Sequence, residues 1–588
     1  MNTLRFVFPY VKAHGLGYLA GLAFVPISSL SALAIPYLTG EAVKILEAGA
    51  AGLSAGAPAG FSQVLALVLA AGAARGLSLL AARYLIISAS RKAEYDIRND
   101  LFRHLQTLDQ HYLKGARTGD LMARFTSDVE RVRTVAGPVI LYAAGTLSTL
   151  AVALPLMASV SWALTAAALV PLGLLFAAVR WMGPRVHRAL LEAQETFSEV
   201  SSLAQENFAG ARVVKAFAIE DHELERMRGV SRTYADRNLR AARLAGWMVP
   251  VLGGAGDLSA IALLFVGGAL ALSGQLSLSD IVKFSGYQSL LIWPMIALGW
   301  TVNQFQRAGA SVERLEELLA SEPLVKDKPA RARAPGSPGI VSGAVSIRGV
   351  TFAYDRQPVL LDVSVEVPAG SFVGIVGRTG SGKSTLVSLI PRLYAVPDGR
   401  IFVDGIDVND LPLRELRRAI GFVPQESFLF SRTVNENIAF GTEGSDLEDV
   451  CEAARIARLE EDIDRFPRGY HEIVGERGVT LSGGQKQRAS IARALLVRPK
   501  ILILDDALSA VDTQTEEEIL ANLRRAARGI TTIVVSHRIS SIRDADRIYV
   551  LESGRIAEEG RHAELLERGG IYAEIHRRQR LAEELDRL

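Results

Sequence analysis

Long apolar runs dominate the first half of the chain, and each is close to the ~20 residues that an α-helix needs to cross a bilayer. Six such runs are present: Leu16–Leu38, Phe61–Ile87, Pro138–Ser159, Trp162–Met182, Trp247–Leu272 and Asp280–Val302. The first is too long for the apolar segment of a cleavable signal peptide, and further runs follow it. The pattern therefore predicts six membrane-spanning helices, with a tight hairpin around Ser161 between the third and the fourth.

The segments between these runs differ sharply in charge. Arg91–Arg133 and Arg185–Arg243 are rich in arginine and lysine, whereas the other connections between runs contain a single basic residue, Lys44. By the positive-inside rule, the two basic segments and both termini lie in the cytoplasm.

The two basic segments are also periodic. Apolar residues recur at helical spacing in Asp96–Leu108 and Glu192–Phe217, which favours helices over disordered charged loops. We expect the membrane helices to continue into the cytoplasm and to turn near His111–Gly119 and Phe217–His222. These two tips are expected to dock on a cytoplasmic domain.

The second half of the chain has a different pattern. A helical tail at Ser311–Ala320 leads into Lys326–Ser342, which is rich in Pro, Ala, Gly and Arg and is typical of a linker. Short apolar strands then alternate with helices, at Val345–Ile347, Phe372–Val376, Ile401–Val403, Gly421–Val423, Ile501–Leu504, Thr532–Val535 and Arg547–Leu551. The pattern predicts three parts: an α-helical six-span membrane domain with cytoplasmic extensions (1–310), a linker (311–342), and an α/β domain with a largely parallel sheet and a C-terminal helix (343–588).

Composition supports a membrane protein. Of the 588 residues 49% are hydrophobic, and the mean hydropathy is +0.22. The formal net charge of +2 is too balanced to suggest a nucleic-acid partner. One cysteine, Cys451, cannot form an internal disulfide, and no zinc-binding spacing is present.

A phosphate-binding loop follows the strand Phe372–Val376. The residues from Gly377 to Ser384 fit the pattern G-x-x-x-x-G-K-[ST], with a helix predicted after them. Glycines let the backbone wrap phosphates, the Lys383 ammonium reaches them, and the Ser384 hydroxyl binds Mg²⁺. The candidate ATP-binding residues of this loop are Gly377, Thr379, Gly380, Ser381, Gly382, Lys383, Ser384 and Thr385.

Two further motifs point to phosphate chemistry. The apolar strand Ile501–Leu504 ends at Asp505, which is placed to hold Mg²⁺ directly or through water. The segment Leu481-Ser482-Gly483-Gly484-Gln485 is a second candidate anion cradle at a helix start, formed by Ser482, Gly483, Gly484 and Gln485. Since one P-loop already supplies a cradle, the second is best explained by a nucleotide that another subunit holds.

These motifs together resemble the ATP-binding cassette (ABC) transporters, and the resemblance covers nearly the whole chain. Further matching elements are Tyr354, similar to the adenine-stacking aromatic; Gln425, similar to the Q-loop residue that also approaches Mg²⁺; Gly475–Gly478, similar to the exporter X-loop; Ser509–Asp512, similar to the D-loop; and His537, similar to the switch histidine. Six spans before one such domain resemble an exporter half-transporter. The resemblance implies a multi-pass protein of the inner (plasma) membrane with a cytoplasmic ATPase domain, and ATP and Mg²⁺ as cofactors. It also implies a second half-transporter chain that pairs head-to-tail, in a lipid bilayer.

One residue departs from the family pattern. The family has Glu after the Asp of the Walker B strand as general base, and this chain has Asp506. Asp is shorter by one methylene, ~1.5 Å, and a ~1 Å misplacement can cost ~100-fold in rate. The catalytic candidates Asp506, Gln425 and His537 would then form a slow site.

This combination resembles the degenerate chain of bacterial heterodimeric multidrug exporters, whose intact signature completes the partner's competent site. The predicted function is ATP-driven export of amphipathic drugs, lipids or peptides by a heterodimer. A homodimeric lipid flippase and an ATP-gated or regulatory subunit remain as alternatives.

Ionisable residues inside predicted spans are candidates for a substrate path. Arg75 and Asp257 could line a polar cavity, or Asp257 could pair with an arginine, whereas Arg83, nearer the cytoplasmic end of its span, is expected to snorkel at the membrane boundary. The tail Tyr572–Leu588 places Ile575, Leu581, Leu585 and Leu588 near one helix face, which predicts either a short coiled seam with the partner's tail or a solvated end.

Overall fold

The computed structural model describes residues 2–51, 60–328, 340–355, 357–442, 444–475, 478, 480–526 and 528–586. Its contacts divide the chain into two units, Met1–Leu105 with Thr118–Ala320, and Gln106–Arg117 with Ser321–Leu588. Residues 329–339 of the predicted linker, together with Glu476 and Arg477 of the X-loop, lie outside the described residues.

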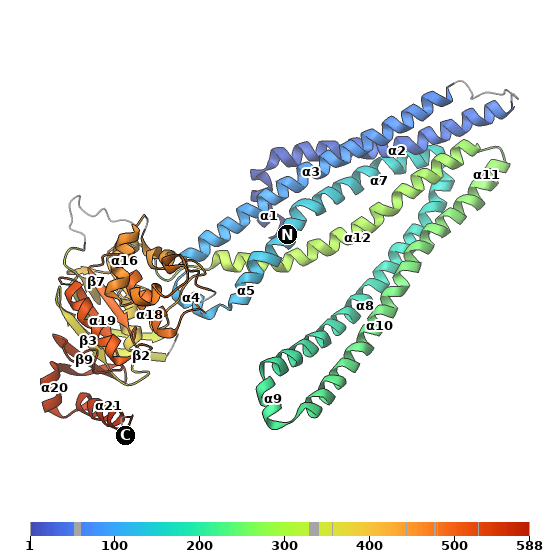
Figure 1. Ribbon diagram of the computed structural model, residues 1–588. Helices are drawn as coiled ribbons and strands as arrows, with labels where there is room; N and C mark the ends of the chain where they lie inside the picture. The colour runs from blue at the N-terminus through green and yellow to red at the C-terminus, as the bar shows by residue number, and fades with distance from the viewer. Residues whose placement is uncertain are drawn as a thin grey trace. The chain divides into compact units, whose positions relative to one another are not determined.

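Every element of secondary structure in the described residues of the first unit is a helix (Figure 1). Its elements are α1 (Asn2–Ala13), α2 (Gly15–Ala51), α3 (Phe61–Thr107, shared with the second unit), α5 (Thr118–Ala123), η1 (Arg124–Asp128), α6 (Val129–Thr134), η2 (Val135–Val139), α7 (Ile140–Val160), α8 (Trp162–Ala209), α9 (Ala211–Phe217), α10 (Glu220–Ala262), η3 (Leu263–Gly267), α11 (Gly268–Leu272) and α12 (Leu278–Ala320). The helices α3 and α8 run unbroken for 47 and 48 residues, which confirms that membrane helices continue past their apolar runs.

Four stretches of this unit are helical, long and apolar enough to cross a membrane: Gly15–Ala48, Phe61–Thr107, Thr118–Val160 and Leu278–Ala320. They contain the first, second, third and sixth predicted spans. The fourth and fifth predicted spans lie on α8 and on α10–α11, where the described apolar stretches are Trp162–Pro171 and Asp257–Leu272. The sharp turn predicted between α8 and α7 occurs at Ser161, whose hydroxyl caps α8 by accepting from the amide of Leu164 at 3.3 Å.

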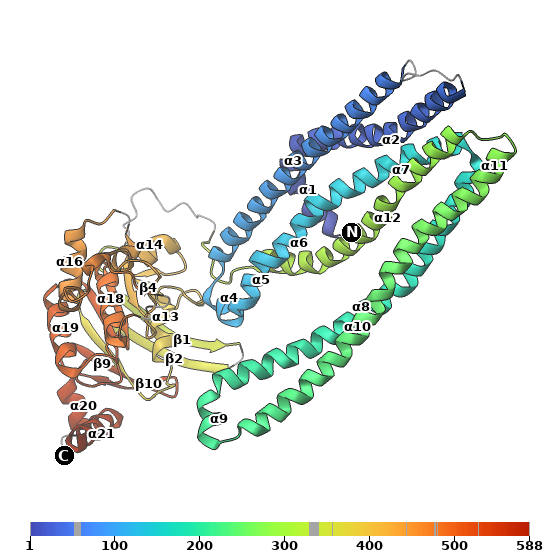
Figure 2. The ribbon, with the colours of Figure 1, turned by 45° about the vertical axis from the view of Figure 1, so that its right-hand side comes forward.

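The helices α8 and α10 pack along each other as a long hairpin with α9 at its tip (Figures 1 and 2). Leu164 of α8 and Leu263 of η3 are buried in one apolar cluster with Leu33 of α2, Met157 of α7 and Phe284 of α12. This cluster attaches the hairpin to the other membrane helices at the end opposite α9.

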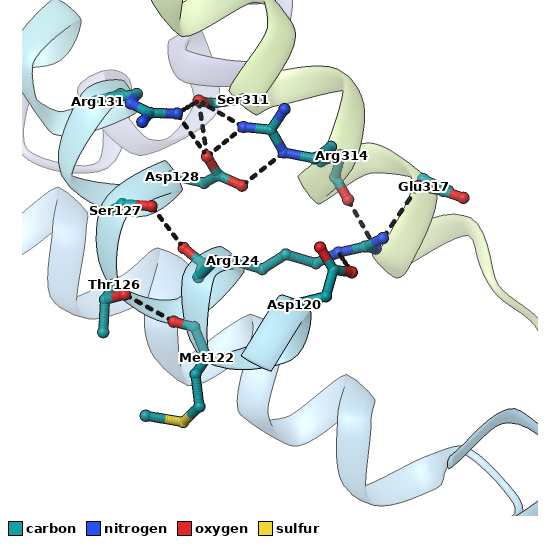
Figure 3. Close-up of polar contacts among 11 residues, drawn as sticks. Asp120, Met122, Arg124, Thr126, Ser127, Asp128, Arg131, Ser311, Arg314 and Glu317 are labelled. Atoms are coloured by element: carbon teal, nitrogen blue, oxygen red, sulfur yellow. Dashed lines mark hydrogen bonds and ion pairs between the residues drawn. The ribbon is translucent and has the colours of Figure 1, made fainter. Parts of the chain in front are cut away.

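A buried carboxylate joins the third membrane helix to the end of α12. Asp128 is 1% exposed, and it accepts hydrogen bonds from Ser311 Oγ at 2.9 Å, Arg314 Nε at 2.8 Å and Arg131 Nη1 at 3.2 Å. Figure 3 shows Arg131 from α6 and Ser311 and Arg314 from α12 converging on Asp128 of η1. A buried charge is tolerated when it is paired and its lone pairs are satisfied, as here.

Arg124 makes a second connection one turn away. Its guanidinium donates to Asp120 Oδ2 at 3.0 Å, to the Arg314 carbonyl at 3.1 Å and to Glu317 Oε2 at 3.2 Å. We name Asp128, Arg124, Ser311 and Arg314 the α12 clamp (Figure 3). The π-helical turn η1 carries both Arg124 and Asp128, and such turns are frequent at functional sites.

We expect Asp128→Asn to destabilise the folded protein by about 2 kcal/mol. Removing one partner of a fully buried ion pair costs about 3–5 kcal/mol, and Arg314 is 38% exposed, so part of that loss is screened. The measurement is the thermal midpoint of the purified protein. Glu225→Gln is the control, since the Glu225–Arg228 ion pair is exposed and lies outside the clamp, and an equal shift for both variants would contradict the clamp.

The second unit contains two sheets. The six-stranded sheet has the order β10-β9-β3-β8-β7-β6, with β9, β3, β8, β7 and β6 parallel and β10 antiparallel to β9. The four-stranded antiparallel sheet has the order β2-β1-β4-β5. The strands are β1 (Val345–Tyr354), β2 (Gln357–Val367), β3 (Phe372–Val376), β4 (Ile401–Val403), β5 (Ile406–Asp407), β6 (Ile420–Val423), β7 (Ile501–Asp505), β8 (Thr531–Val535), β9 (Arg547–Glu552) and β10 (Arg555–Gly560).

The parallel sheet confirms the predicted α/β fold, with one correction. Val345–Ile347 and Ile401–Val403 belong to the antiparallel sheet, because they pair with each other and β1 pairs with β2. The helices are α4 (Gln110–Gly115), α13 (Lys383–Leu389), α14 (Leu413–Arg418), α15 (Val434–Ile438), η4 (Ala439–Gly441), α16 (Leu447–Ile456), α17 (Glu460–Ile463), η5 (Gly469–His471), α18 (Gly483–Leu496), α19 (Thr513–Ala526), α20 (His562–Arg568) and α21 (Ile571–Asp586).

Candidate nucleotide site

The phosphate-binding loop joins β3 to α13. Gly382 has φ 101°, a conformation that favours glycine, and a Cβ there would lie 2.8 Å from Leu360 Cδ2. A Cβ on Gly377 would lie 2.0 Å from the Leu551 carbonyl oxygen. Glycine is therefore required at both ends of the loop, while a Cβ on Gly380 would meet open space.

Lys383 begins α13 and is buried inside the loop. Its ammonium donates to the carbonyls of Gly377 and Arg378, both at 2.9 Å. Burial lowers the pKa of Lys383, and the nearby Asp506 and Asp505 oppose that shift. The loop thus holds a cation beneath its backbone, at the place where an anion is expected.

Ser384 and Asp505 meet across the sheet. The Ser384 hydroxyl donates to Asp505 Oδ1 at 2.8 Å, and Asp505 is buried at the carboxyl end of β7. Burial raises the pKa of Asp505, and the bond from Ser384 opposes that shift. A hydroxyl beside a carboxylate is the type of oxygen donor set that suits Mg²⁺.

A cavity of about 230 Å³ brings the remaining motif residues together. Its lining includes Thr379, Gly380, Gly382, Lys383, Ser384, Thr385, Gln425, Asp505, Asp506 and His537. Gln425 follows β6 and His537 follows β8, so both come from carboxyl ends of parallel strands, as the sequence pattern predicted. Burial lowers the pKa of His537, and Lys383 lowers it further.

Asp506 has an unusual backbone. Its φ is 49°, in the left-handed region, and its amide donates to the Val535 carbonyl at 2.9 Å. Asn and Asp are the non-glycine residues that tolerate this region best. The short acid at this position therefore fits its backbone.

Tyr354 lies in an aromatic cluster beside the loop. Its hydroxyl is 3.2 Å from Thr385 Oγ1, and its ring packs edge-on against Tyr394 with the two centroids 5.2 Å apart. The ammonium of Lys114, from α4, lies 5.6 Å from the Tyr354 ring centroid and 5.3 Å from that of Tyr394. These are cation–π distances.

The segment that carries Lys114 is one of the two predicted tips. The Asp109 carboxylate caps α4 and also accepts from the amide of Leu324 at 2.6 Å. His111 Nε2 is 3.7 Å from Asp355 Oδ1. The tip thus contacts the domain that holds the P-loop, at its aromatic cluster, whereas the second tip, α9, belongs to the first unit.

The signature segment opens α18. Ser482 and Gln485 form a reciprocal capping box, in which the Ser482 hydroxyl accepts from the Gln485 amide at 3.3 Å and Gln485 Oε1 accepts from the Ser482 amide at 2.9 Å. A Cβ on Gly484 would lie 2.9 Å from the Ala510 carbonyl oxygen, and Gln487 Oε1 accepts from the Ala510 amide at 2.9 Å. These contacts fix the signature segment to the D-loop. Ser482 to Gln485 are not among the residues that line the P-loop cavity.

The C-terminal helix α21 contacts the loop that carries His537. Gln579 Nε2 donates to the His537 carbonyl, and Gln579 Oε1 accepts from the Ile539 amide at 3.0 Å. Ile575 lies with Gln579 beside Gly377, and Tyr572 is buried in the domain core. Ile575 therefore packs against its own domain, whereas Leu581 is exposed and the side chains of Leu585 and Leu588 lie outside the described residues, so the seam with a partner's tail stays a prediction.

Lys114, Tyr394 and Gln579 were not identified as site residues from the sequence. Each acts through a partner that is distant along the chain, and none belongs to a local motif. Only the helical spacing of apolar residues in the first basic segment, Arg91–Arg133, indicated that a cytoplasmic tip lies near Lys114.

Comparisons with known proteins agree with this geometry. Residues 18–295 match the family model of the ABC transporter transmembrane region, and residues 360–509 match that of the ABC transporter. A probable multidrug resistance ABC transporter ATP-binding/permease protein of Bacillus subtilis is 35% identical over 97% of both chains. An ATP-dependent lipid A-core flippase of Syntrophus aciditrophicus is 35% identical over 82% of this chain and 80% of its own. A solved bacterial Atm1-family ABC exporter with ATP bound has a TM-score of 0.77 and 28% identity, covering 97% of this chain and 99% of that one.

Proposed function

Because this chain belongs to the ABC transporter family, as an exporter half-transporter that couples ATP hydrolysis to transport, we propose that it pairs with a second, non-identical half-transporter. It is a membrane protein with a cytoplasmic ATPase domain that uses ATP and Mg²⁺, and such exporters act as dimers in a lipid bilayer. In the proposed pair, the chain's own nucleotide site hydrolyses slowly and its signature completes the partner's faster site.

The observation that carries the proposal is the position of Asp506. It lines the P-loop cavity beside Lys383 and Asp505, where the family has a longer general base. The left-handed backbone at this position is more favourable for Asp than for Glu, so the local conformation favours the shorter acid. The signature, in contrast, is intact and capped, and this combination of a weak base with a sound signature favours two unequal sites.

The residues of the cavity fit ATP and Mg²⁺. The loop from Gly377 to Gly382 would hold the phosphates with Lys383, and Ser384, Asp505 and Gln425 would face Mg²⁺, which neutralises developing phosphate charge. Tyr354 would stack on the adenine. Lys114 lies against the same aromatic cluster, so a shift of the Tyr354 ring on stacking would displace Lys114. The displacement would then reach the rest of α4, the tip that is continuous along the chain with the membrane helices.

A homodimeric lipid flippase is the second candidate. It is favoured by the 35% identity to the lipid A-core flippase of S. aciditrophicus. In a homodimer both sites would carry Asp506, and hydrolysis would be slow at each.

The test is to purify the tagged chain from its native membrane and to identify the chains that accompany it. A single non-identical half-transporter at equal amount, with ATPase activity and substrate uptake in vesicles, is the expected result. An active assembly that contains this chain alone would replace the proposal with the homodimer. Nucleotide-dependent gating without uptake would indicate a regulatory subunit.

We expect Gln579→Leu to weaken ATP retention at this chain's own P-loop about three- to tenfold. The substitution keeps the size of the side chain and removes two hydrogen bonds that hold the backbone on both sides of Arg538, each worth about 1 kcal/mol. The measurement is the dissociation constant of a fluorescent ATP analogue at that site. Arg577→Gln, on the exposed face of the same helix, is the control, and an equal loss in both would mean that α21 acts only through its general stability.

A further inference from the structure

The loop after β8 carries a guanidinium that reaches the D-loop. Arg538 directly follows His537, and its side chain bonds two backbone carbonyls and one carboxylate. Its Nη1 donates to the Val511 carbonyl at 3.0 Å and to Glu516 Oε2 at 2.6 Å. Its Nη2 donates to the Ser509 carbonyl at 3.3 Å. Arg538 therefore connects the loop that carries His537 to the D-loop of the same chain.

Glu516 is a buried carboxylate in the first turn of α19. It is 1% exposed, and it shares a helix face with Ile519 and Leu520, which belong to the domain core. A charge on a buried face is costly unless it is paired and its lone pairs are satisfied. The Ser541 hydroxyl donates to Oε1 of Glu516, and Arg538 donates to Oε2. The carboxylate thereby holds the Arg538 guanidinium in one place.

The signature helix α18 holds the D-loop from another side. Gln487 of α18 donates through Nε2 to Ser509 Oγ at 3.0 Å and accepts the Ala510 amide through Oε1 at 2.9 Å. Ser509 and Ala510 are themselves exposed, so this part of the D-loop is accessible to a partner. A continuous series of bonds thus runs from Arg538 through the D-loop to the helix that begins with the signature.

The backbone of Arg538 is fixed as well. Gln579 of α21 bonds the His537 carbonyl and the Ile539 amide, on both sides of Arg538. The Arg538 amide donates to Ser536 Oγ at 2.9 Å. A side chain that leaves a fixed backbone and ends on fixed acceptors loses little further freedom when it acts, so its position is well defined.

We infer that Arg538 is a positioning residue for ATP hydrolysis, which sets the D-loop, and through it the signature, relative to the loop that carries His537. His537 lines the cavity of this chain's own P-loop, whereas Ser482 to Gln485 do not. The inference rests on the proposed function, in which the signature faces the partner's ATP. Arg538 then joins the segment beside this chain's own nucleotide to the segment that completes the partner's site. A ~1 Å misplacement can cost ~100-fold in rate, so a loosened D-loop should lower turnover.

The rival explanation is that Arg538 only neutralises Glu516. A cation with that role needs a bond to the carboxylate, whereas Arg538 also donates to two D-loop carbonyls. The two explanations differ when both charges are removed together. Replacing a buried ion pair by apolar residues of similar volume is often neutral or stabilising. Such a variant should fold, but it should lack the bonds to the D-loop.

The experiment measures kcat and KM of steady-state ATP hydrolysis by the purified, assembled exporter, together with its thermal midpoint. In the double variant Arg538→Met with Glu516→Leu, we expect kcat to fall at least about tenfold and KM to stay within about twofold, because the loss lies in positioning. Arg538→Lys is the second variant, since its ammonium can stay beside Glu516 but lacks the fork that reaches both carbonyls. It should lower kcat about threefold or more with little change in the thermal midpoint.

Arg543→Gln is the matched control. Arg543 lies in the same loop, and its Nη2 is 3.5 Å from Glu517 Oε1, the residue after Glu516 on α19. Both side chains of that pair are 51% exposed, and exposed pairs contribute little. Arg543→Gln should therefore keep kcat.

A folded double variant that keeps kcat within about twofold of the wild type would overturn the inference and leave a structural ion pair. An equal loss in Arg543→Gln would also overturn it, because the effect would then be general to the loop. If the double variant does not assemble, Arg538→Lys decides, and an unchanged kcat there would count against the positioning role.

Nucleotide trapping at each P-loop tests the pairing separately. Loss at the partner's P-loop is the expected result, and it supports both the inference and the head-to-tail arrangement. Loss confined to this chain's own P-loop would still support Arg538 as the positioning residue, but it would contradict that arrangement. Total hydrolysis thus decides the inference, and the P-loop that loses trapping decides the proposed function on which it rests.

Discussion

Ser482→Asp should lower steady-state ATP hydrolysis by the assembled exporter more than about 100-fold. Under the proposed head-to-tail pairing, Ser482 at the start of α18 faces the phosphates of the partner's ATP. A unit charge ~4 Å from another contributes about 4 kcal/mol at an effective dielectric constant of 20, which exceeds the ~2.7 kcal/mol of a 100-fold change. The added carboxylate would therefore repel the phosphates.

The substitution is informative because it leaves the fold of the signature intact. Asp and Ser cap helices equally well, so α18 should keep the cap that Ser482 now provides to Gln485. Ser482→Asn is the matched control, since Asn caps the helix without charge, and it should lose far less activity. Nucleotide trapping at each P-loop gives the second readout: loss at this chain's own P-loop, with the partner's unaffected, would contradict the head-to-tail arrangement.

The parts of the fold that the sequence predicted are those that local pattern determines. The strand Phe372–Val376 and the loop after it follow from an apolar run, glycines and a lysine within thirteen residues, and β3 has the predicted bounds. The continuous helices α3 and α8 follow from apolar periodicity that persists after the membrane runs end. The antiparallel sheet was missed although β2 alternates buried and exposed residues, as a half-buried antiparallel strand does, because the pattern of one strand does not show which strands pair with it.

The parts that the sequence could not predict depend on contacts between distant segments. Asp128 and Arg314 are 186 positions apart, and their pairing depends on how η1 and α12 pack. Gln579 lies 42 positions from His537, in a tail whose apolar spacing suggested a different partner. Periodicity shows which face of a helix is apolar, but it does not show which element covers that face.

Asp506→Asn should reduce steady-state ATP hydrolysis of the complex less than about threefold, whereas replacing the partner's catalytic Glu with Gln should reduce it more than about 100-fold. Under the proposed pairing Asp506 is a short base in the slower of two sites, so its loss should remove little from the total rate. The substitution is also structurally mild. Asn tolerates the left-handed backbone at φ 49° as well as Asp does, so the P-loop cavity should keep its shape.

Asp506→Glu tests the same idea from the other side. It restores the reach of the family's base, but Glu is disfavoured in the left-handed region and the site would still be completed by the partner's own signature. We therefore expect no large gain in hydrolysis. If Asp506→Asn alone removed nearly all activity, Asp506 would be the working base at both sites, and the homodimer would become the better description, because only two identical chains would then depend on one short acid.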